Sequence, residues 1–144
     1  MNATEQAIEH FTRRLQHETD VSDVAERLAS GDPGLVLVDV RDDASWAQGR
    51  IAGALHLPRR EIAARARALV PGGAEVVTYC WGPGCNGATK GALAFAELGY
   101  RVKEMLGGYE YWVREGLETE SAAGPRRLEP DALTVAIGSP ACAC

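Results

Sequence analysis

Two short and nearly continuous apolar runs constrain the fold of this chain more than any other feature. Residues 35–40 read Leu-Val-Leu-Val-Asp-Val, and residues 75–79 read Glu-Val-Val-Thr-Tyr. Runs of this length between turn-forming residues indicate strands that are buried on both faces, as in a parallel sheet. Because helix-like segments alternate with these strands, we expect an α/β protein with helices on both faces of a parallel sheet.

The pattern divides the chain into three parts. Residues 1–17 carry apolar side chains at helical spacing and predict an amphipathic N-terminal helix. Residues 18–116 hold the alternating strands and helices, and Ser22 is the expected N-cap of the first of these helices. Residues 117–144 form a C-terminal extension in which residues 121–127 indicate a linker, because they are rich in small residues with Gly and Pro.

The remaining elements follow from the same patterns. Helices are expected at residues 43–48, 61–69, 88–99 and 109–114, and strands at residues 54–57 and 100–106. Residues 131–137 predict either one more strand or a segment that lies along the surface. Residues 139–144 form a tail of small residues that is expected to be mobile.

Length and charge exclude several classes of protein. The chain has 144 residues, which predicts one domain with its own core. Its net charge of -5 and pI near 5.2 argue against general nucleic-acid binding. No apolar run is long enough to span a bilayer, and residues 1–6 lack the features of a secretory leader. We therefore expect a cytoplasmic protein that binds neither nucleic acid nor membrane.

A cysteine follows the second apolar run directly. Cys80 precedes Gly82, Pro83, Gly84 and Gly87, and a helix-like pattern starts after them. A glycine-rich loop that leads into a helix N-terminus lets backbone N–H groups converge, and this setting stabilises a thiolate. Because the thiolate is the nucleophilic form, we predict that Cys80 is catalytic rather than a small buried apolar side chain.

Four segments within residues 18–116 resemble, in the family's order, motifs of the rhodanese-like sulfurtransferase domain. They are residues 37–41 (Leu-Val-Asp-Val-Arg), 49–58 (Gly-Arg-Ile-Ala-Gly-Ala-Leu-His-Leu-Pro), 76–80 (Val-Val-Thr-Tyr-Cys) and 106–112 (Leu-Gly-Gly-Tyr-Glu-Tyr-Trp). The first contains an Asp-x-Arg motif, the third ends in the active-site cysteine, and the last resembles a Gly-Gly…Trp signature. The resemblance implies a single rhodanese-like domain, with a parallel sheet of about five strands and helices on both faces.

The resemblance also implies a reaction. Cys80 is expected to accept a sulfane sulfur from a small-molecule donor such as thiosulfate or a persulfide, and to carry it as a persulfide. It then passes the sulfur to a thiol or another acceptor, which is a small molecule or a protein. No cofactor is implied. The residues implied for substrate binding are Trp81, Gly82, Pro83, Gly84, Cys85 and Asn86, through their backbone N–H groups where present, together with the charge of Arg41.

The loop departs from the family pattern in its charge. Many family members carry a basic residue inside the loop, whereas residues 81–86 have none, which weakens the expectation that thiosulfate is the donor. Arg50 stands where the family usually has histidine, and we interpret this as a structural variation. No arginine occurs between Cys80 and Tyr100. A cysteine phosphatase needs an arginine there to clamp a phosphoryl group, so phosphatase chemistry is excluded.

Three further cysteines leave alternatives open. Cys85 is either a resolving thiol, which attacks a Cys80 persulfide or sulfenate and closes a disulfide, or a small side chain that fits the loop. Cys142 and Cys144 either relay sulfur or electrons to the site or belong to a tail without a catalytic role. The spacing of the four cysteines does not match a common zinc site, so no metal is expected.

Two functions of other classes compete with sulfur transfer. One is a rhodanese-like regulatory or binding module, and the other is a thiol-redox protein that uses Cys80 and Cys85. The presence of the cysteine among glycines favours catalysis over a binding module. A thioredoxin-type site separates its cysteines by two residues, whereas four residues separate Cys80 from Cys85.

Overall fold

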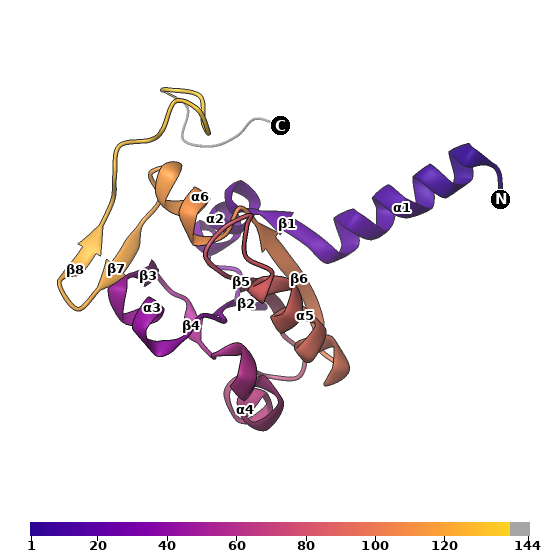
Figure 1. Ribbon diagram of the computed structural model, residues 1–144, viewed down its shortest axis with the longest axis horizontal. Coiled ribbons are helices and arrows are strands. Elements are labelled where there is room, and N and C mark those ends of the chain that lie inside the picture. Colours follow the sequence, from indigo (N-terminus) through magenta and orange to yellow (C-terminus); the bar gives the residue numbers. More distant parts are fainter. Residues whose placement is uncertain (139–144) are drawn as a thin grey trace.

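The computed structural model describes residues 1–138, and a five-stranded parallel sheet lies at its centre (Figure 1). The strand order is β1-β6-β5-β2-β4, and every neighbouring pair is parallel. The strands are β1 (Glu18–Asp20), β2 (Leu35–Asp39), β4 (Leu55–His56), β5 (Glu75–Tyr79) and β6 (Arg101–Leu106). The expected α/β fold is therefore confirmed, with β5 and β2 in the interior of the sheet.

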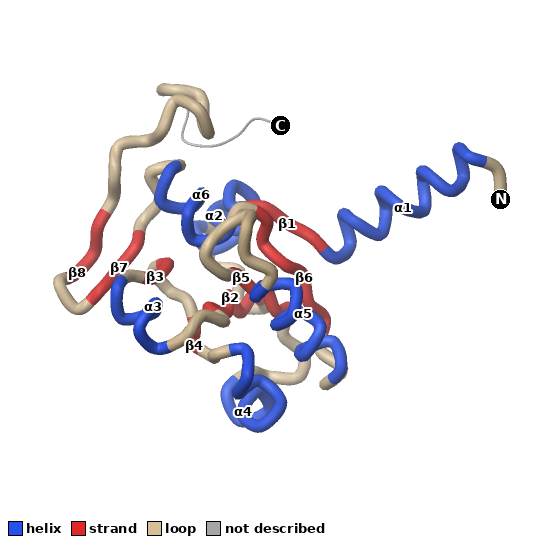
Figure 2. The backbone as a smooth tube through the Cα atoms, in the orientation of Figure 1, coloured by secondary structure: helices blue, strands red, loops and turns tan. Residues whose placement is uncertain are grey.

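Helices cover both faces of this sheet (Figure 2). One face packs against α4 (Ile62–Leu69), which follows a short 3-10 turn, η1 (Arg59–Glu61), and against α5 (Gly87–Glu97). The other face packs against α2 (Val21–Ala29) and α6 (Gly108–Arg114). α3 (Asp43–Gln48) lies in the connection between β2 and β3 (Arg50–Ile51). Each face thus has its own apolar core.

The alternation of side chains along β2 and β5 explains why both runs are apolar. Val36 and Val38 of β2 join the core under α4 and α5, whereas Leu35 and Leu37 join the core under α2 and α6. Because successive side chains of a strand point to opposite faces, a strand covered on both sides needs apolar residues at nearly every position. The same alternation directs the residue after β5, Cys80, toward the α5 side of the sheet.

The N-terminal helix α1 (Ala3–His17) projects away from the sheet (Figure 1). Asn2 and Glu5 form a capping box that closes its N-terminus, and α1 has no buried residue. Its apolar side chains Ile8, Phe11 and Leu15 are 58–76% exposed. The predicted amphipathic helix is therefore confirmed, but its apolar stripe does not cover the core of the domain.

Two details differ from the sequence predictions, and one pair of alternatives is decided. The N-cap of α2 is Asp20, whose side chain accepts a hydrogen bond from the Asp23 N–H, rather than Ser22. The predicted linker at residues 121–127 instead belongs to a hairpin of β7 (Thr119–Ser121) and β8 (Gly124–Arg126), which pairs with β3 in a second, antiparallel sheet. Of the two alternatives for residues 131–137, the strand is wrong, because these residues contain turns, and the segment along the surface remains.

Two properties of the described part bear on function. No helix within residues 1–138 combines the length and the apolar character that crossing a membrane requires. The same residues contain no group of three or more His, Cys, Asp or Glu side chains that could hold a metal ion.

Candidate active site

Cys80 lies at the carboxyl end of β5, where a second element fixes its backbone. Its side chain is 7% exposed, and its carbonyl accepts a hydrogen bond of 2.9 Å from the N–H of Tyr109 in α6. Gly108, with a φ of +63°, makes this approach possible, because a Cβ there would come within 2.7 Å of the Cys80 carbonyl oxygen. The Gly107-Gly108 pair thus holds α6 against the cysteine.

The loop after Cys80 is held at both of its ends. The carbonyl of Trp81 accepts a 2.8 Å bond from the N–H of Glu110, and the N–H of Cys85 donates to the carbonyl of Gly82 at 3.0 Å across Pro83. The Cys85 N–H is therefore already in use within the loop. Among the described residues, four other backbone N–H groups of this loop have no hydrogen-bond partner. They belong to Trp81, Gly82, Gly84 and Asn86.

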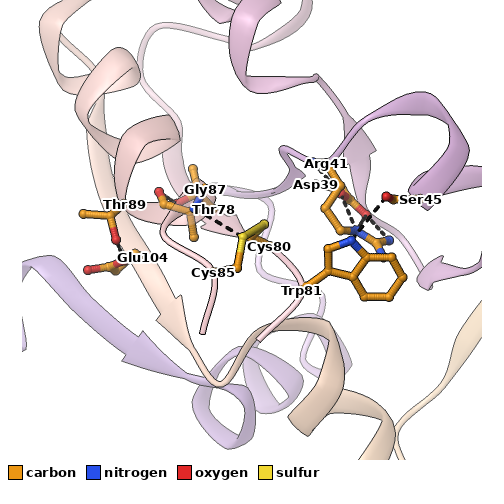
Figure 3. Close-up of a disulfide and its surroundings, with 11 residues drawn as sticks. Asp39, Arg41, Ser45, Thr78, Cys80, Trp81, Cys85, Gly87, Thr89 and Glu104 are labelled. Atoms are coloured by element: carbon orange, nitrogen blue, oxygen red, sulfur yellow. Dashed lines mark hydrogen bonds and ion pairs between the residues drawn. A yellow bond between two sulfur atoms is a disulfide. The ribbon is translucent and has the colours of Figure 1, made fainter. Parts of the chain in front are cut away.

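A disulfide joins Cys80 to Cys85 (Figure 3). Their Cα atoms lie 6.4 Å apart, within the range that a disulfide spans. The loop therefore curls back as the resolving-thiol hypothesis requires, although the use of this bond in a reaction stays a prediction. Gly87, the first residue of α5, lies beside both sulfur atoms and donates its N–H to Cys85 Sγ at 3.4 Å.

A buried network lies next to the cysteine on the opposite face of the sheet. Asp39 is fully buried and accepts a bond of 2.6 Å from the Tyr79 hydroxyl and another of 2.6 Å from Nη2 of Arg41. Burial, reinforced by the Asp39 charge, raises the pKa of Tyr79 well above its usual value, which keeps the phenol a donor. This network fixes the carboxyl ends of β2 and β5 relative to each other.

Arg41 is buried, and its guanidinium forms hydrogen bonds with groups of the protein rather than with solvent. It is 3% exposed, and Nη2 also donates to the carbonyl of Gly49 at 2.7 Å. Burial alone lowers the pKa of its guanidinium, but the hydrogen bonds and the charge of Asp39 outweigh this and raise the pKa. Only Nη1 lacks a partner among the described residues. The role of Arg41 in substrate binding stays a prediction, and these contacts favour a supporting role.

Aromatic rings cover Arg41 and connect it to the loop. The guanidinium lies 4.4 Å from the ring centroid of Trp81 and 4.5 Å from that of Tyr109. The indole N–H of Trp81 donates to Ser45 Oγ at 3.2 Å (Figure 3). Because a cation attracts the face of an aromatic ring, Arg41 orients Trp81 beside the cysteine loop. Trp81 thus forms a wall beside the cysteine loop.

A cavity of about 660 Å³ opens beside the loop on the side of Cys85. Its walls come from the loop, from α6 and from the C-terminal extension, which contributes Leu128. The lining residues are Trp81, Gly82, Gly84, Cys85, Tyr109, Glu110, Val113, Arg114 and Leu128. Cys80 is not among them, so Cys85 is the sulfur that faces this cavity. The lining role of the α6 residues was not predicted, although Tyr109 and Glu110 belong to the Gly-Gly-Tyr-Glu segment that was visible in the sequence.

Charges around the loop are balanced. Glu110 pairs with Arg114 at 2.9 Å, and Arg114 also pairs with Asp131 at 2.9 Å. A second cavity of about 480 Å³ lies at the end of β2, where Arg59 and Arg60 face three carboxylates. Those carboxylates belong to Asp42, Asp43 and Glu61. Neither cavity therefore has an excess of positive charge.

The remaining predicted residues lie at or beyond the edge of the site. Asn86 is the N-cap residue of α5 but makes no side-chain cap bond. Arg50 lies over the Trp46 ring at 4.7 Å and forms an ion pair with Glu120 at 3.7 Å, which agrees with a structural role. Cys142 and Cys144 lie outside the described residues.

Comparison with known protein families gives a match over most of the alternating region. Residues 20–115 match the family described as the rhodanese-like domain. This range runs from the last residue of β1 through α6 and includes all four segments on which the sequence resemblance rests.

Individual proteins agree with this match. A curated protein of Allochromatium vinosum, named a sulfurtransferase, is 32% identical over 76% of this chain and the whole of its own length. A crystal structure of a Bacillus halodurans protein is 40% identical with a TM-score of 0.79, covering 84% of this chain and 88% of that one. An HTH-type transcriptional regulator of Mycobacterium tuberculosis is 34% identical over 69% of this chain, and the match spans 44% of the regulator.

Proposed function

The chain belongs to the rhodanese-like domain family, and from this premise we propose that it transfers sulfane sulfur through a persulfide on Cys80. The observation that carries the proposal is the position of Cys80 at the end of β5, in a loop whose free N–H groups precede the N-terminus of α5. The similarity to a protein named a sulfurtransferase supports the same class of activity.

The first displacement starts from reduced Cys80. Its thiolate attacks the outer sulfur of the donor, and the rest of the donor leaves with the electron pair of the broken S–S bond. The free N–H groups of Trp81, Gly82, Gly84 and Asn86 are suited to hold the negative charge of the new persulfide. The positive end of the α5 dipole adds to this stabilisation.

The charge balance favours a persulfide of a small thiol over thiosulfate as the donor. Thiosulfate concentrates two negative charges on the reacting S–SO3 group, whereas the carboxylates of glutathione persulfide lie away from its reacting sulfur. Binding this compact dianion beside the loop without unpaired cations costs desolvation energy. The guanidinium of Arg114 is already paired, and Arg59 and Arg60 share their cavity with three carboxylates. We therefore expect kcat/KM to be at least about tenfold higher for glutathione persulfide than for thiosulfate, an expectation from charge pairing alone.

The second displacement passes the sulfur to a thiol of a small molecule or of a protein. The cycle begins and ends with Cys80 as a reduced thiolate, whereas the structure has it in a disulfide. A reducing compartment such as the cytoplasm meets this need, since thiols there are kept reduced. We propose that the protein acts in that compartment without a metal or an organic cofactor.

The test is the formation of a persulfide on Cys80. Reduced protein is incubated without oxygen with thiosulfate, 3-mercaptopyruvate or glutathione persulfide, and the modified cysteine is located by peptide mass spectrometry after alkylation. We expect a sulfur adduct on Cys80, removal of the adduct by cyanide or a thiol, and no turnover in Cys80→Ser. A folded, reduced protein that gives neither adduct nor turnover with any donor would refute sulfur transfer.

A negative result would favour the second candidate, a binding or regulatory module. The match to a transcriptional regulator supports this candidate. The matching segment makes up 44% of that protein, so a similar domain is combined there with further sequence. In that case the Cys80–Cys85 pair would respond to oxidants without passing sulfur to any acceptor.

A further inference from the structure

We propose that Cys85 resolves the Cys80 persulfide by attacking Cys80 Sγ, so that the domain releases sulfide and closes the Cys80–Cys85 disulfide. This inference rests on the proposed function, because it begins from the persulfide. It names a second activity for the same site, the reduction of sulfane sulfur to sulfide. It also names the partner that must follow, a dithiol that reopens the disulfide.

The backbone brings the two sulfur atoms together without a further change of fold. The loop between them is closed by the Cys85 N–H bond to the Gly82 carbonyl, and the disulfide forms across it. Gly87 leaves the necessary space, because a Cβ there would lie 2.7 Å from Cys80 Sγ and 3.4 Å from Cys85 Sγ. The Gly87 N–H, directed at Cys85 Sγ, also stabilises negative charge on the attacking sulfur.

The geometry selects which sulfur of the persulfide is attacked. Attack on the outer sulfur would only move the persulfide from Cys80 to Cys85. Attack on Cys80 Sγ forms the bond that the structure contains, between Cys80 Sγ and Cys85 Sγ. This second reaction is the one for which the two side chains are already placed.

The step balances without an external oxidant. The Cys85 thiolate forms a bond to Cys80 Sγ, the bond from that atom to the sulfane sulfur breaks, and the sulfane sulfur leaves as hydrosulfide with the electron pair. The proton lost by Cys85 matches the proton carried by hydrosulfide. Two cysteine sulfurs are oxidised to the disulfide, and one sulfane sulfur is reduced by two electrons to sulfide.

The exposure of the two cysteines predicts how the disulfide is reopened. Cys85 is partly exposed and lines the cavity beside Trp81 and Leu128, whereas Cys80 is 7% exposed and does not line it. An incoming thiolate therefore reaches Cys85 first. Cys80 is then the leaving group, and its thiolate is stabilised at the N-terminus of α5. The second thiol of the dithiol completes the exchange and returns both cysteines to the reduced form.

The test uses one turnover of prereduced, desalted protein under anaerobic conditions. Both proteins carry Cys142→Ser and Cys144→Ser, so that no other cysteine of the chain takes part, and they differ only at Cys85. Each receives one equivalent of glutathione persulfide, and both sulfide release and intact mass are followed. With Cys85 present we expect about one sulfide per chain and a mass decrease of about 2 Da; with Cys85→Ser we expect a stable gain of about 32 Da and sulfide release at least tenfold slower.

Each other outcome has a defined meaning. A stable gain of one sulfur in both proteins would overturn the resolving role while leaving the proposed sulfur transfer intact. A sulfur adduct mapped to Cys85 rather than a disulfide would overturn attack on Cys80 Sγ. If neither protein acquires sulfur or forms a disulfide, the proposed function fails, and this inference fails with it. The same chain incubated without donor must stay reduced, which excludes oxidation by residual oxygen.

Discussion

Gly87 lies so close to Cys80 that any side chain at the start of α5 would displace the cysteine sulfur. A Cβ at position 87 would come within 2.7 Å of Cys80 Sγ, a distance that side chains do not adopt. The start of α5 and the residue that follows β5 thus meet at Cys80 Sγ, the sulfur on which the proposed chemistry depends. The contact makes Gly87 a positioning residue for Cys80, and it can be tested without changing either cysteine.

Gly87→Ala should impair the cysteine pair while the domain stays folded. The added methyl group displaces Cys80 Sγ, so we expect persulfide formation and disulfide closure to slow by at least about tenfold, since small misplacements of a nucleophile cost this much. Gly73→Ala is the matched control, because nothing lies within 4 Å of a Cβ there, its φ is not in the left-handed region, and it lies outside the site. It should stay within about twofold of the wild type in the same assay. Equal rates for the two variants would contradict the positioning role.

Gly108→Ala should reduce the stability of the whole domain. An alanine there meets the cost of a left-handed conformation, roughly 1–2 kcal/mol, and it also clashes with the Cys80 carbonyl, the Gly82 nitrogen and the Trp81 carbonyl carbon. Gly53→Ala isolates the second effect, because Gly53 also has a positive φ, of +86°, but has nothing within 4 Å. Urea unfolding should show Gly108→Ala less stable than Gly53→Ala by about 1–3 kcal/mol. Similar losses would mean that α6 shifts easily away from the loop.

The apolar runs revealed the centre of the fold, because β2 and β5 are covered on both faces and so contain little but apolar residues. Strand β1 could not be found in this way. Its sequence, Glu18-Thr19-Asp20, is polar, and it becomes a strand by pairing with β6 at the edge of the sheet. The β7–β8 hairpin was hidden for a similar reason, since it depends on pairing with β3, a strand far away in the sequence.

The candidate site, like the fold, could be predicted from the sequence only where its residues are consecutive. Cys80 and its glycine-rich loop were visible because they are consecutive in the sequence. The contacts of Tyr109 and Glu110 with the loop were not visible, since they depend on α6 folding back over the end of β5. The pairing of Cys85 with Cys80 stayed one of two alternatives, because spacing alone does not determine whether a loop curls back.

Arg41→Lys should affect stability far more than the choice of donor. Lysine keeps the charge but cannot make the forked contact that Arg41 makes with Asp39, so we expect a loss of about 1–3 kcal/mol in urea unfolding. Arg50→Lys is the control, because its ion pair with Glu120 is partly exposed, and it should cost less than about 1 kcal/mol. The ratio of kcat/KM for glutathione persulfide and thiosulfate should not change in Arg41→Lys. A decrease of kcat/KM for thiosulfate alone would instead indicate that Arg41 binds the substrate.

Tyr79→Phe should lower stability at neutral pH, and the loss should shrink at alkaline pH. The variant removes the bond from the hydroxyl to Asp39 and the bond from the Ile51 N–H to the hydroxyl, which should cost about 1–3 kcal/mol at pH 8.

The pH dependence of this loss follows from the raised pKa of Tyr79 in the folded protein, caused by burial and by Asp39. Below pH about 10 the phenol is neutral in both states, so its full contribution to stability is present. Above that pH the unfolded tyrosine ionises while the folded one stays protonated, and the contribution falls by up to about 1.4 kcal/mol per pH unit until the folded pKa is reached.

The measurement is urea unfolding of the wild type and Tyr79→Phe from pH 8 to 11, because titrations shared by the two proteins cancel in their difference. Tyr111→Phe is the control at pH 8: no hydrogen bond of its hydroxyl occurs among the described residues, so the change should stay below about 0.5 kcal/mol. A difference between wild type and Tyr79→Phe that stays constant or grows with pH would show that Asp39 does not hold the Tyr79 proton in the folded protein.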